Sequence, residues 1–228
     1  MARIETGILG GFSGRIGNVV SCYRHGKYYL RTLPEKVNHP NTEKQLAQRM
    51  RFTIIQQYLK PISKFIHLGF GAYADGRSAY NAAMSYNLEH ALTGSYPFLS
   101  IDFAKARVSQ GNLPGALNAT MQQSGTNGIT VTWENVGGAK GAKDTDLAVV
   151  LLFDPTTKYV ASFTSAGKRA YGQAHIILPD TPCNKKLYGY LCFINEAVLA
   201  GKLNPENISD SCFCGVVEIG GENLGSGV

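Results

Sequence analysis

The stretch Ile129-Thr-Val-Thr-Trp133-Glu134 alternates large apolar side chains with polar ones. Successive side chains of a β-strand point to opposite faces of the sheet, so Ile129, Val131 and Trp133 would share one face. The pattern predicts a strand with one buried face and one face in solvent.

Similar β-prone runs separated by Gly, Pro, Asn and Asp lie on both sides of this strand. The further strands expected are 116–122, 146–154, 158–163, 170–178, 187–195 and 211–219. Seven strands over roughly 105 residues are typical of an immunoglobulin-like antiparallel β-sandwich. The apolar run 147–153 is too short for a membrane helix, which needs about 20 residues, and is expected as a buried strand without membrane contact.

The start of the chain is dense in glycine, at Gly7, Gly10, Gly11, Gly14 and Gly17. Glycine tolerates backbone angles that other residues avoid, so we expect a glycine-rich arm with unusual backbone angles or close approach of another chain. Two strands should follow at 18–23 and 27–31, and Gly26 supplies the turn of this hairpin. Pro34 and Pro40 mark an extended connector.

Two helices are expected after this connector. Thr42 and Gln45 have the spacing of a capping box. Apolar side chains then recur at helical spacing: Leu46, Met50, Ile54, Ile55, Tyr58, Leu59 and Ile62. Such a stripe packs in a core or against another subunit. Pro61 should interrupt this helix, residues 69–71 should end it, and a second helix is expected at about 78–92.

Two stretches resemble a fibronectin type III domain. Ile129-Thr-Val-Thr-Trp133-Glu-Asn looks like its second strand, where a tryptophan packs in the core. The stretch 187–195, followed by Gly201 and residues 209–211, is similar to its sixth and seventh strands. The resemblance implies a fold but names no partner.

The whole chain also resembles an uncharacterised protein family of Bacteroidota and their mobile elements. The residues that carry this resemblance are Gly10-Gly-Phe-Ser-Gly14-Arg-Ile-Gly17-Asn-Val-Val20, Gly26, Arg31, Thr42, Gln45, Arg49 and Phe52. The resemblance covers nearly the full length and implies a shared architecture with an N-terminal GGFSGxxG module, but no assigned activity.

Positive charge is concentrated in the first third of the chain. Residues 1–70 hold eleven Lys and Arg against three Glu, whereas the remainder holds eleven against thirteen Asp and Glu. The positive field of the protein, whose net charge is +6, therefore belongs almost wholly to the N-terminal part. This field would attract a polyanion or an acidic neighbouring subunit, or it is a solvated surface that favours solubility.

Catalytic and metal-binding motifs are not recognisable in the sequence. The five cysteines come without an apolar leader, since Arg3 and Glu5 occupy the start, so free thiols in a reducing compartment are expected. Cys212 and Cys214 would share one side of a strand, where two small buried residues are favoured over a thiolate metal site. Gly11, Gly14 and Gly17 lack the context of a phosphate-binding loop. We expect no enzyme activity, catalytic residue, metal or cofactor.

The strongest candidate site combines basic and aromatic residues of the hairpin and the first helix: Arg15, Arg24, Lys27, Arg31, Arg49, Arg51, Tyr23, Tyr28 and Tyr29. Cationic side chains can neutralise phosphates while tyrosines stack on exposed bases. Tyrosine and arginine also dominate protein interfaces. The sequence leaves both alternatives open.

These observations predict an α+β protein. Residues 1–94 would form a basic, glycine-rich hairpin and helical module, and residues 95–228 an immunoglobulin or fibronectin III-like β-sandwich with a glycine-rich C-terminal tail. The favoured function is that of a structural subunit of a larger assembly. Its partners would be copies of the same chain or other protein subunits, and a bacteriophage virion is one setting for such an assembly. The alternative is a nucleic-acid-associated binding protein. Synthesis in the cytoplasm is expected.

Overall fold

The computed structural model describes residues 3–4, 11–24, 26–33, 40–73, 76–125, 127–135, 141–178 and 185–219. The chain forms two compact units, Met1–Thr42 and Glu43–Val228. Cys183 and the C-terminal tail lie outside the described residues.

The first unit is a small antiparallel sheet with the strand order β1-β2-β3-β4. Its strands are β1 (Arg3–Ile4), β2 (Phe12–Ile16), β3 (Val19–Arg24) and β4 (Lys27–Thr32). The predicted hairpin is confirmed as β3 and β4, and Gly17 and Gly26 have positive φ angles of 57° and 77° in the turns before and after β3. Strand β2 adds to this hairpin: residues 12 and 13 pair with β1, and residues 14–16 pair with β3. Gly14 within it has a positive φ of 117°, in agreement with the unusual backbone angles expected of the glycine-rich start.

The second unit begins with helices. Helix α1 (Glu43–Leu59) ends just before Pro61, and α2 (Ser63–Gly69) restarts after it, as predicted. A 3-10 turn at Gly71–Tyr73 follows. In α3 (Ala79–His90) the Ser78 side chain caps the N-terminus by accepting a hydrogen bond from the Asn81 amide at 3.2 Å. Among the helices in the part of the chain that the structure describes, none has the length and apolarity that crossing a membrane requires.

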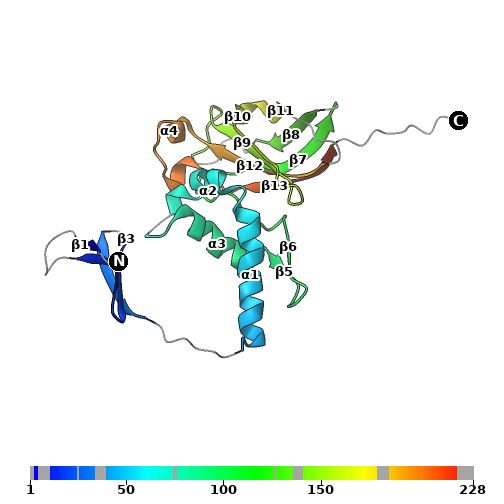
Figure 1. The fold of residues 1–228 in the computed structure, drawn as a ribbon. Coiled ribbons are helices and arrows are strands. Elements are labelled where there is room, and N and C mark those ends of the chain that lie inside the picture. Colours follow the sequence, from blue (N-terminus) through cyan, green and yellow to red (C-terminus); the bar gives the residue numbers. More distant parts are fainter. Residues whose placement is uncertain are drawn as a thin grey trace. The chain divides into compact units, whose positions relative to one another are not determined.

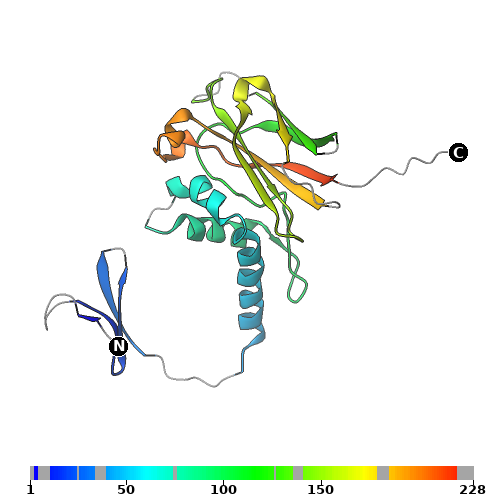
Figure 2. The same cartoon turned by 45° about the horizontal axis from the view of Figure 1, so that its top comes forward.

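Seven strands of the second unit form two antiparallel sheets, in the orders β11-β8-β7 and β10-β9-β12-β13 (Figures 1 and 2). They are β7 (Leu117–Ser124), β8 (Gly128–Glu134), β9 (Leu147–Phe153), β10 (Val160–Lys168), β11 (Gln173–Ile177), β12 (Lys185–Ile194) and β13 (Cys212–Ile219). In immunoglobulin lettering the sheets read E-B-A and C′-C-F-G, which is the topology of an immunoglobulin-like sandwich. The predicted strands and the α+β class are confirmed.

Shorter elements complete the second unit. Strands β5 (Leu92–Thr93) and β6 (Ser100–Ile101) form a separate two-stranded pair. A 3-10 turn at Arg169–Tyr171 precedes β11, while α4 (Glu196–Leu199) and a 3-10 turn at Pro205–Asn207 lie between β12 and β13.

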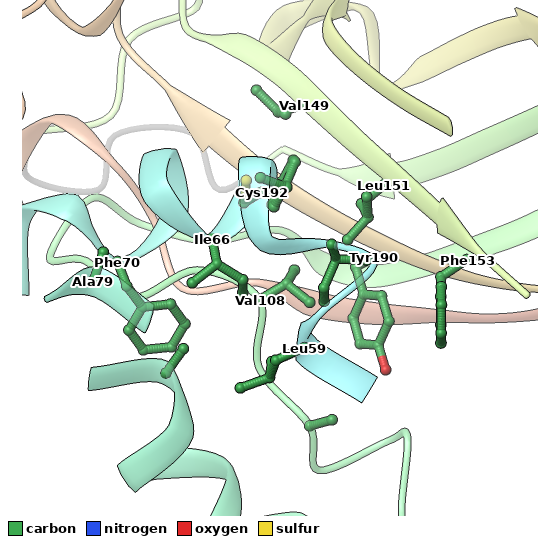
Figure 3. Packing of buried hydrophobic residues seen from close by; sticks show 14 of the residues in the cluster. Leu59, Ile66, Phe70, Ala79, Val108, Val149, Leu151, Phe153, Tyr190 and Cys192 are labelled. Carbon is green, nitrogen blue, oxygen red and sulfur yellow. The ribbon is translucent and has the colours of Figure 1, made fainter. Parts of the chain in front are cut away.

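The sheet that contains β9 and β12 is buried on both faces at its centre. In β9, the side chains of Val149, Leu151 and Phe153 pack with the helices, while those of the alternate residues pack toward the sheet β11-β8-β7. Figure 3 shows Leu59 and Ile66 of the helices near Leu151 and other sheet residues. Burial on both faces explains why the run in β9 is apolar without alternation.

The predicted domain boundary at residues 94 and 95 differs from the division in the structure. The buried side chains Ile55, Leu59 and Ile66 of the helices share one hydrophobic cluster with Tyr190 and Cys192 of β12. Because this core is continuous, the helices belong to the same unit as the sandwich, and the division falls near residue 42.

A buried ion pair between Arg169 and Asp146 lies at one end of the sandwich. Arg169 Nε lies 3.1 Å from Asp146 Oδ2, and each side chain is 1% exposed. The guanidinium lies 3.8 Å from the ring centroid of Phe193 and donates from Nη2 to the Pro114 carbonyl at 2.7 Å. Trp133 Nε1 donates to the Arg169 carbonyl at 3.0 Å. Burial lowers the pKa of Arg169, although Asp146 opposes this shift.

The segment before the sandwich is tied to the segment that precedes its last strand. The Val108 amide donates to Ser211 Oγ at 2.9 Å, and Ser109 Oγ donates to the Ser209 carbonyl at 2.9 Å. Hydrogen bonds between residues about 100 positions apart in the sequence therefore hold the start and the end of the sandwich together.

Candidate interaction site: the two faces of the N-terminal sheet

The strand register of the first unit separates its side chains into two chemically different faces. Val19 pairs with Thr32 and Ile16, Ser21 pairs with Leu30, and Tyr23 pairs with Tyr28. Paired residues of antiparallel strands lie on the same face, and alternate residues along a strand share it. The face that we call the apolar face thus presents Ile16, Val19, Tyr23, Tyr28 and Leu30.

The opposite face, called the basic face below, carries the cationic side chains. Arg24 pairs with Lys27, Cys22 pairs with Tyr29, and Val20 pairs with both Arg15 and Arg31. The basic face therefore presents Arg15, Val20, Cys22, Arg24, Lys27, Tyr29 and Arg31.

All five large side chains of the apolar face are exposed to solvent. The rings of Tyr23 and Tyr28 lie 4.8 Å apart between centroids. The Tyr28 ring also lies so close to Gly11 that a Cβ atom there would collide with it, so glycine is needed for this contact. Leu30 is 65% exposed. Exposed apolar side chains gathered on one face are typical of an interaction surface.

The basic face has no neutralising carboxylate of its own in the described part of the first unit. Residues 11–24 and 26–33 contain four Arg or Lys and no Asp or Glu. Arg15 Nε donates to the Gly17 carbonyl at 3.0 Å, while Arg24 and Lys27 are directly opposite and both positively charged. Like charges opposite one another destabilise a strand pair, so an anion on this face would relieve the repulsion.

The structure divides the nine residues predicted as a site into three groups. Arg15, Arg24, Lys27, Arg31 and Tyr29 share the basic face. Tyr23 and Tyr28 lie on the apolar face instead, so they do not interleave with the cations as predicted. Within β4 this separation follows from the alternation of side chains once the strand is assigned, whereas placing Tyr23 of β3 on the same face as Tyr28 also needs the strand register.

Arg49 and Arg51 form the third group and belong to α1 in the second unit. Arg49 is exposed, whereas Arg51 is half-buried. Arg51 Nη2 donates to the Leu88 carbonyl near the end of α3 at 3.0 Å, so this side chain joins two helices. The Arg51 guanidinium therefore contributes to the packing of α1 against α3, and the use of Arg49 and Arg51 in one site with the hairpin stays a prediction.

Two of the surface pockets in the described part of the second unit combine aromatic and cationic side chains. One, of about 390 Å³, is lined by Tyr58, Phe103, Phe153 and Lys158 among others. The other, of about 530 Å³, includes Arg107, which is paired with Asp210 at 2.7 Å and lies over the Tyr86 ring at 4.7 Å. Both contain mainly side chains that already serve packing or ion pairing.

The three thiols in the described part of the second unit are packing residues. Cys214 is buried and Cys212 is half-buried against the sandwich core, where Cys212 Sγ donates to the Leu191 carbonyl at 3.4 Å. Burial raises the pKa of Cys192 to about 12. Within the described residues, no three His, Cys, Asp or Glu side chains are grouped so that they could hold a metal ion.

Comparison with known proteins places the chain in a family. Two solved structures are similar to it: the fn3 domain of human collagen alpha-1(XX) chain, with 17% identity, a TM-score of 0.33 and coverage of 52% of this chain and 96% of that chain, and the fn3 domain of human contactin 1, with 12% identity, a TM-score of 0.35 and coverage of 60% and 98%. No curated protein matches the chain. A model described as a family of unknown function, DUF6266, matches residues 11–202. Because this match spans most of the chain, the protein belongs to the DUF6266 family.

Proposed function

We propose that the chain is a non-enzymatic structural subunit of a larger assembly and that it contacts a neighbouring subunit through the apolar face of its N-terminal sheet. The observation that carries this proposal is the exposure of all six residues of β4, combined with a register that places five large apolar side chains on one face. A surface of this kind fits a homo-oligomer or another protein subunit.

Energetics support a partner on the apolar face. Domains are built from at least two packed layers, and the described part of the first unit is a single sheet. Fully burying a large apolar side chain contributes about 1.5–3 kcal/mol. Five partly exposed ones offer on the order of 5 kcal/mol toward association, before its entropic cost.

The setting of the assembly is part of the proposal. The resemblance to proteins of Bacteroidota and their mobile elements favours a bacteriophage particle, into which the chain would be incorporated after synthesis in the cytoplasm. Peptides of this chain in purified, nuclease-treated virions would support this setting, and their consistent absence from virions of a phage that encodes the chain would contradict it.

The test of the proposed contact uses two neighbouring residues on opposite faces. Leu30→Ser removes an apolar side chain from the apolar face, whereas Tyr29→Ser removes a comparably exposed one, 51% against 65%, from the basic face. Multi-angle light scattering should show that the full chain self-associates and that Leu30→Ser weakens association about tenfold or more.

The control Tyr29→Ser should leave self-association within about twofold of the original protein. A strict monomer at high concentration, without a co-purifying subunit, would overturn the proposal. Equal effects of the two substitutions would show that the apolar face is not the contact.

A further inference from the structure

The basic face has features that the assembly contact does not use. Arg15, Arg24, Lys27 and Arg31 point away from the apolar face, and in the described structure Arg24, Lys27 and Arg31 form no ion pair. Arg24 and Lys27 face each other as like charges. A bound polyanion would convert this repulsion into attraction.

The spacing of side chains along β4 adds an aromatic group to this charge. Residues two apart on a strand are about 6.8 Å apart, so Tyr29 lies between Arg31 and Lys27, with each cation about one such step away. Tyr29 is half exposed, and its cross-strand partner is the small Cys22. A ring flanked by two cations can stack on a base while the cations contact adjoining phosphates.

We infer that the basic face of the N-terminal sheet binds single-stranded nucleic acid. Charge complementarity indicates a polyanion, and the exposed ring of Tyr29 favours one whose bases are unstacked, because a duplex hides the faces of its bases. This activity goes beyond the proposed assembly role. Since the two faces are opposite sides of one sheet, a subunit contact and a nucleic-acid strand can occupy it together.

Fluorescence anisotropy with a labelled, mixed-sequence single-stranded DNA of about 20 nucleotides tests the inference on the full chain. Each phosphate contact to a single strand contributes about 0.7 to the slope of log affinity against log salt concentration. Four cations therefore predict a slope of about −3, which is a roughly 50-fold loss of affinity between 50 and 200 mM salt.

Substitutions on the basic face separate the contribution of charge to DNA binding from the contribution of ring stacking. Arg24→Gln with Lys27→Gln should reduce the slope to about −1.4 and weaken binding at 50 mM salt about tenfold or more. Tyr29→Ser should weaken binding about tenfold with little change in the slope, because it removes stacking but no charge. The matched control is Lys60→Gln with Lys64→Gln, which removes the same charge from exposed residues of the second unit and should leave the slope unchanged.

The thiol of Cys22 gives a readout that does not depend on a substitution. Cys22 is exposed and lies on the basic face next to Tyr29. Bound single strand should slow its modification by a maleimide at least fivefold at low salt, measured by mass spectrometry of the peptide that contains Cys22.

Several results would overturn the inference. The first is that the Gln pair on the basic face and the control Gln pair weaken DNA binding equally. The second is that DNA does not slow the modification of Cys22. The third is that DNA binding does not depend on salt concentration. Equally tight binding of heparin that Tyr29→Ser does not change would indicate an acidic polymer instead of nucleic acid. If DNA binding fails while Leu30→Ser still disrupts self-association, this inference falls and the assembly proposal stands.

Discussion

Strands β4 and β9 have similar lengths but opposite environments. All six residues of β4 are exposed, whereas β9 has six buried residues and one half-buried residue. The two faces of β9 are equally apolar because a layer covers each of them, the helices on one side and the second sheet on the other. The two faces of β4 differ from each other, which is expected where each face meets a different partner.

The largest effect expected from this comparison concerns the buried ion pair of the second unit. Arg169→Ala would leave Asp146 charged and buried, so we expect the free energy of unfolding to fall by about 3–5 kcal/mol. Urea denaturation followed by the fluorescence of Trp133, the only tryptophan, measures this change. The double variant Arg169→Met with Asp146→Asn should recover part of the loss, and a single variant as stable as the original protein would contradict a stabilising role.

The second prediction compares two leucines directly. Leu151→Ala removes a fully buried side chain from β9 and should destabilise the second unit by about 2–5 kcal/mol in the same assay. Leu30→Ala should change the stability of the monomeric first unit by less than about 0.5 kcal/mol, measured by hydrogen exchange of the β3 and β4 amides in dilute solution. Similar losses at the two positions would show that β4 has a covering layer within its own chain.

Between pH 9 and 10 we expect the smallest of the losses in stability of the second unit. Burial raises the pKa of Cys192 to about 12, so the folded state keeps this thiol protonated where the unfolded state ionises. The associated stability is fully present below the ordinary thiol pKa near 9 and is lost as pH rises toward 12, at up to about 1.4 kcal/mol per pH unit. The melting temperature of the second unit should therefore fall between pH 9 and 10, and this fall should be smaller in the variant Cys192→Ala. An identical decline in the variant would assign it to other groups.

Local pattern predicted much of the fold. Alternation located β8, the apolar run located β9, and Pro61 marked the break between α1 and α2, because each signal lies within a few consecutive residues. The predicted position of Trp133 in the core is confirmed by its burial and its edge-to-face contact with Phe193 at 5.7 Å.

Pairing between distant residues was harder to predict. The apolar stripe of α1 could not reveal that Ile55 and Leu59 pack with β12, so the boundary was misplaced. Likewise, Arg51 has the charge of a surface residue, and only the fold brings it to the Leu88 carbonyl. To predict which residues of different strands share a face of the N-terminal sheet, one needs the strand register as well as the strands themselves.

The bonds that join Val108 and Ser109 to Ser209 and Ser211 also determine the order in which the chain can fold. A ribosome must synthesise nearly all of the second unit before these contacts can form, and contacts between distant residues make folding slow. In the first unit each strand pairs with the next one along the chain. The N-terminal sheet can therefore form during synthesis, and its two faces would be available to partners before the rest of the chain has folded.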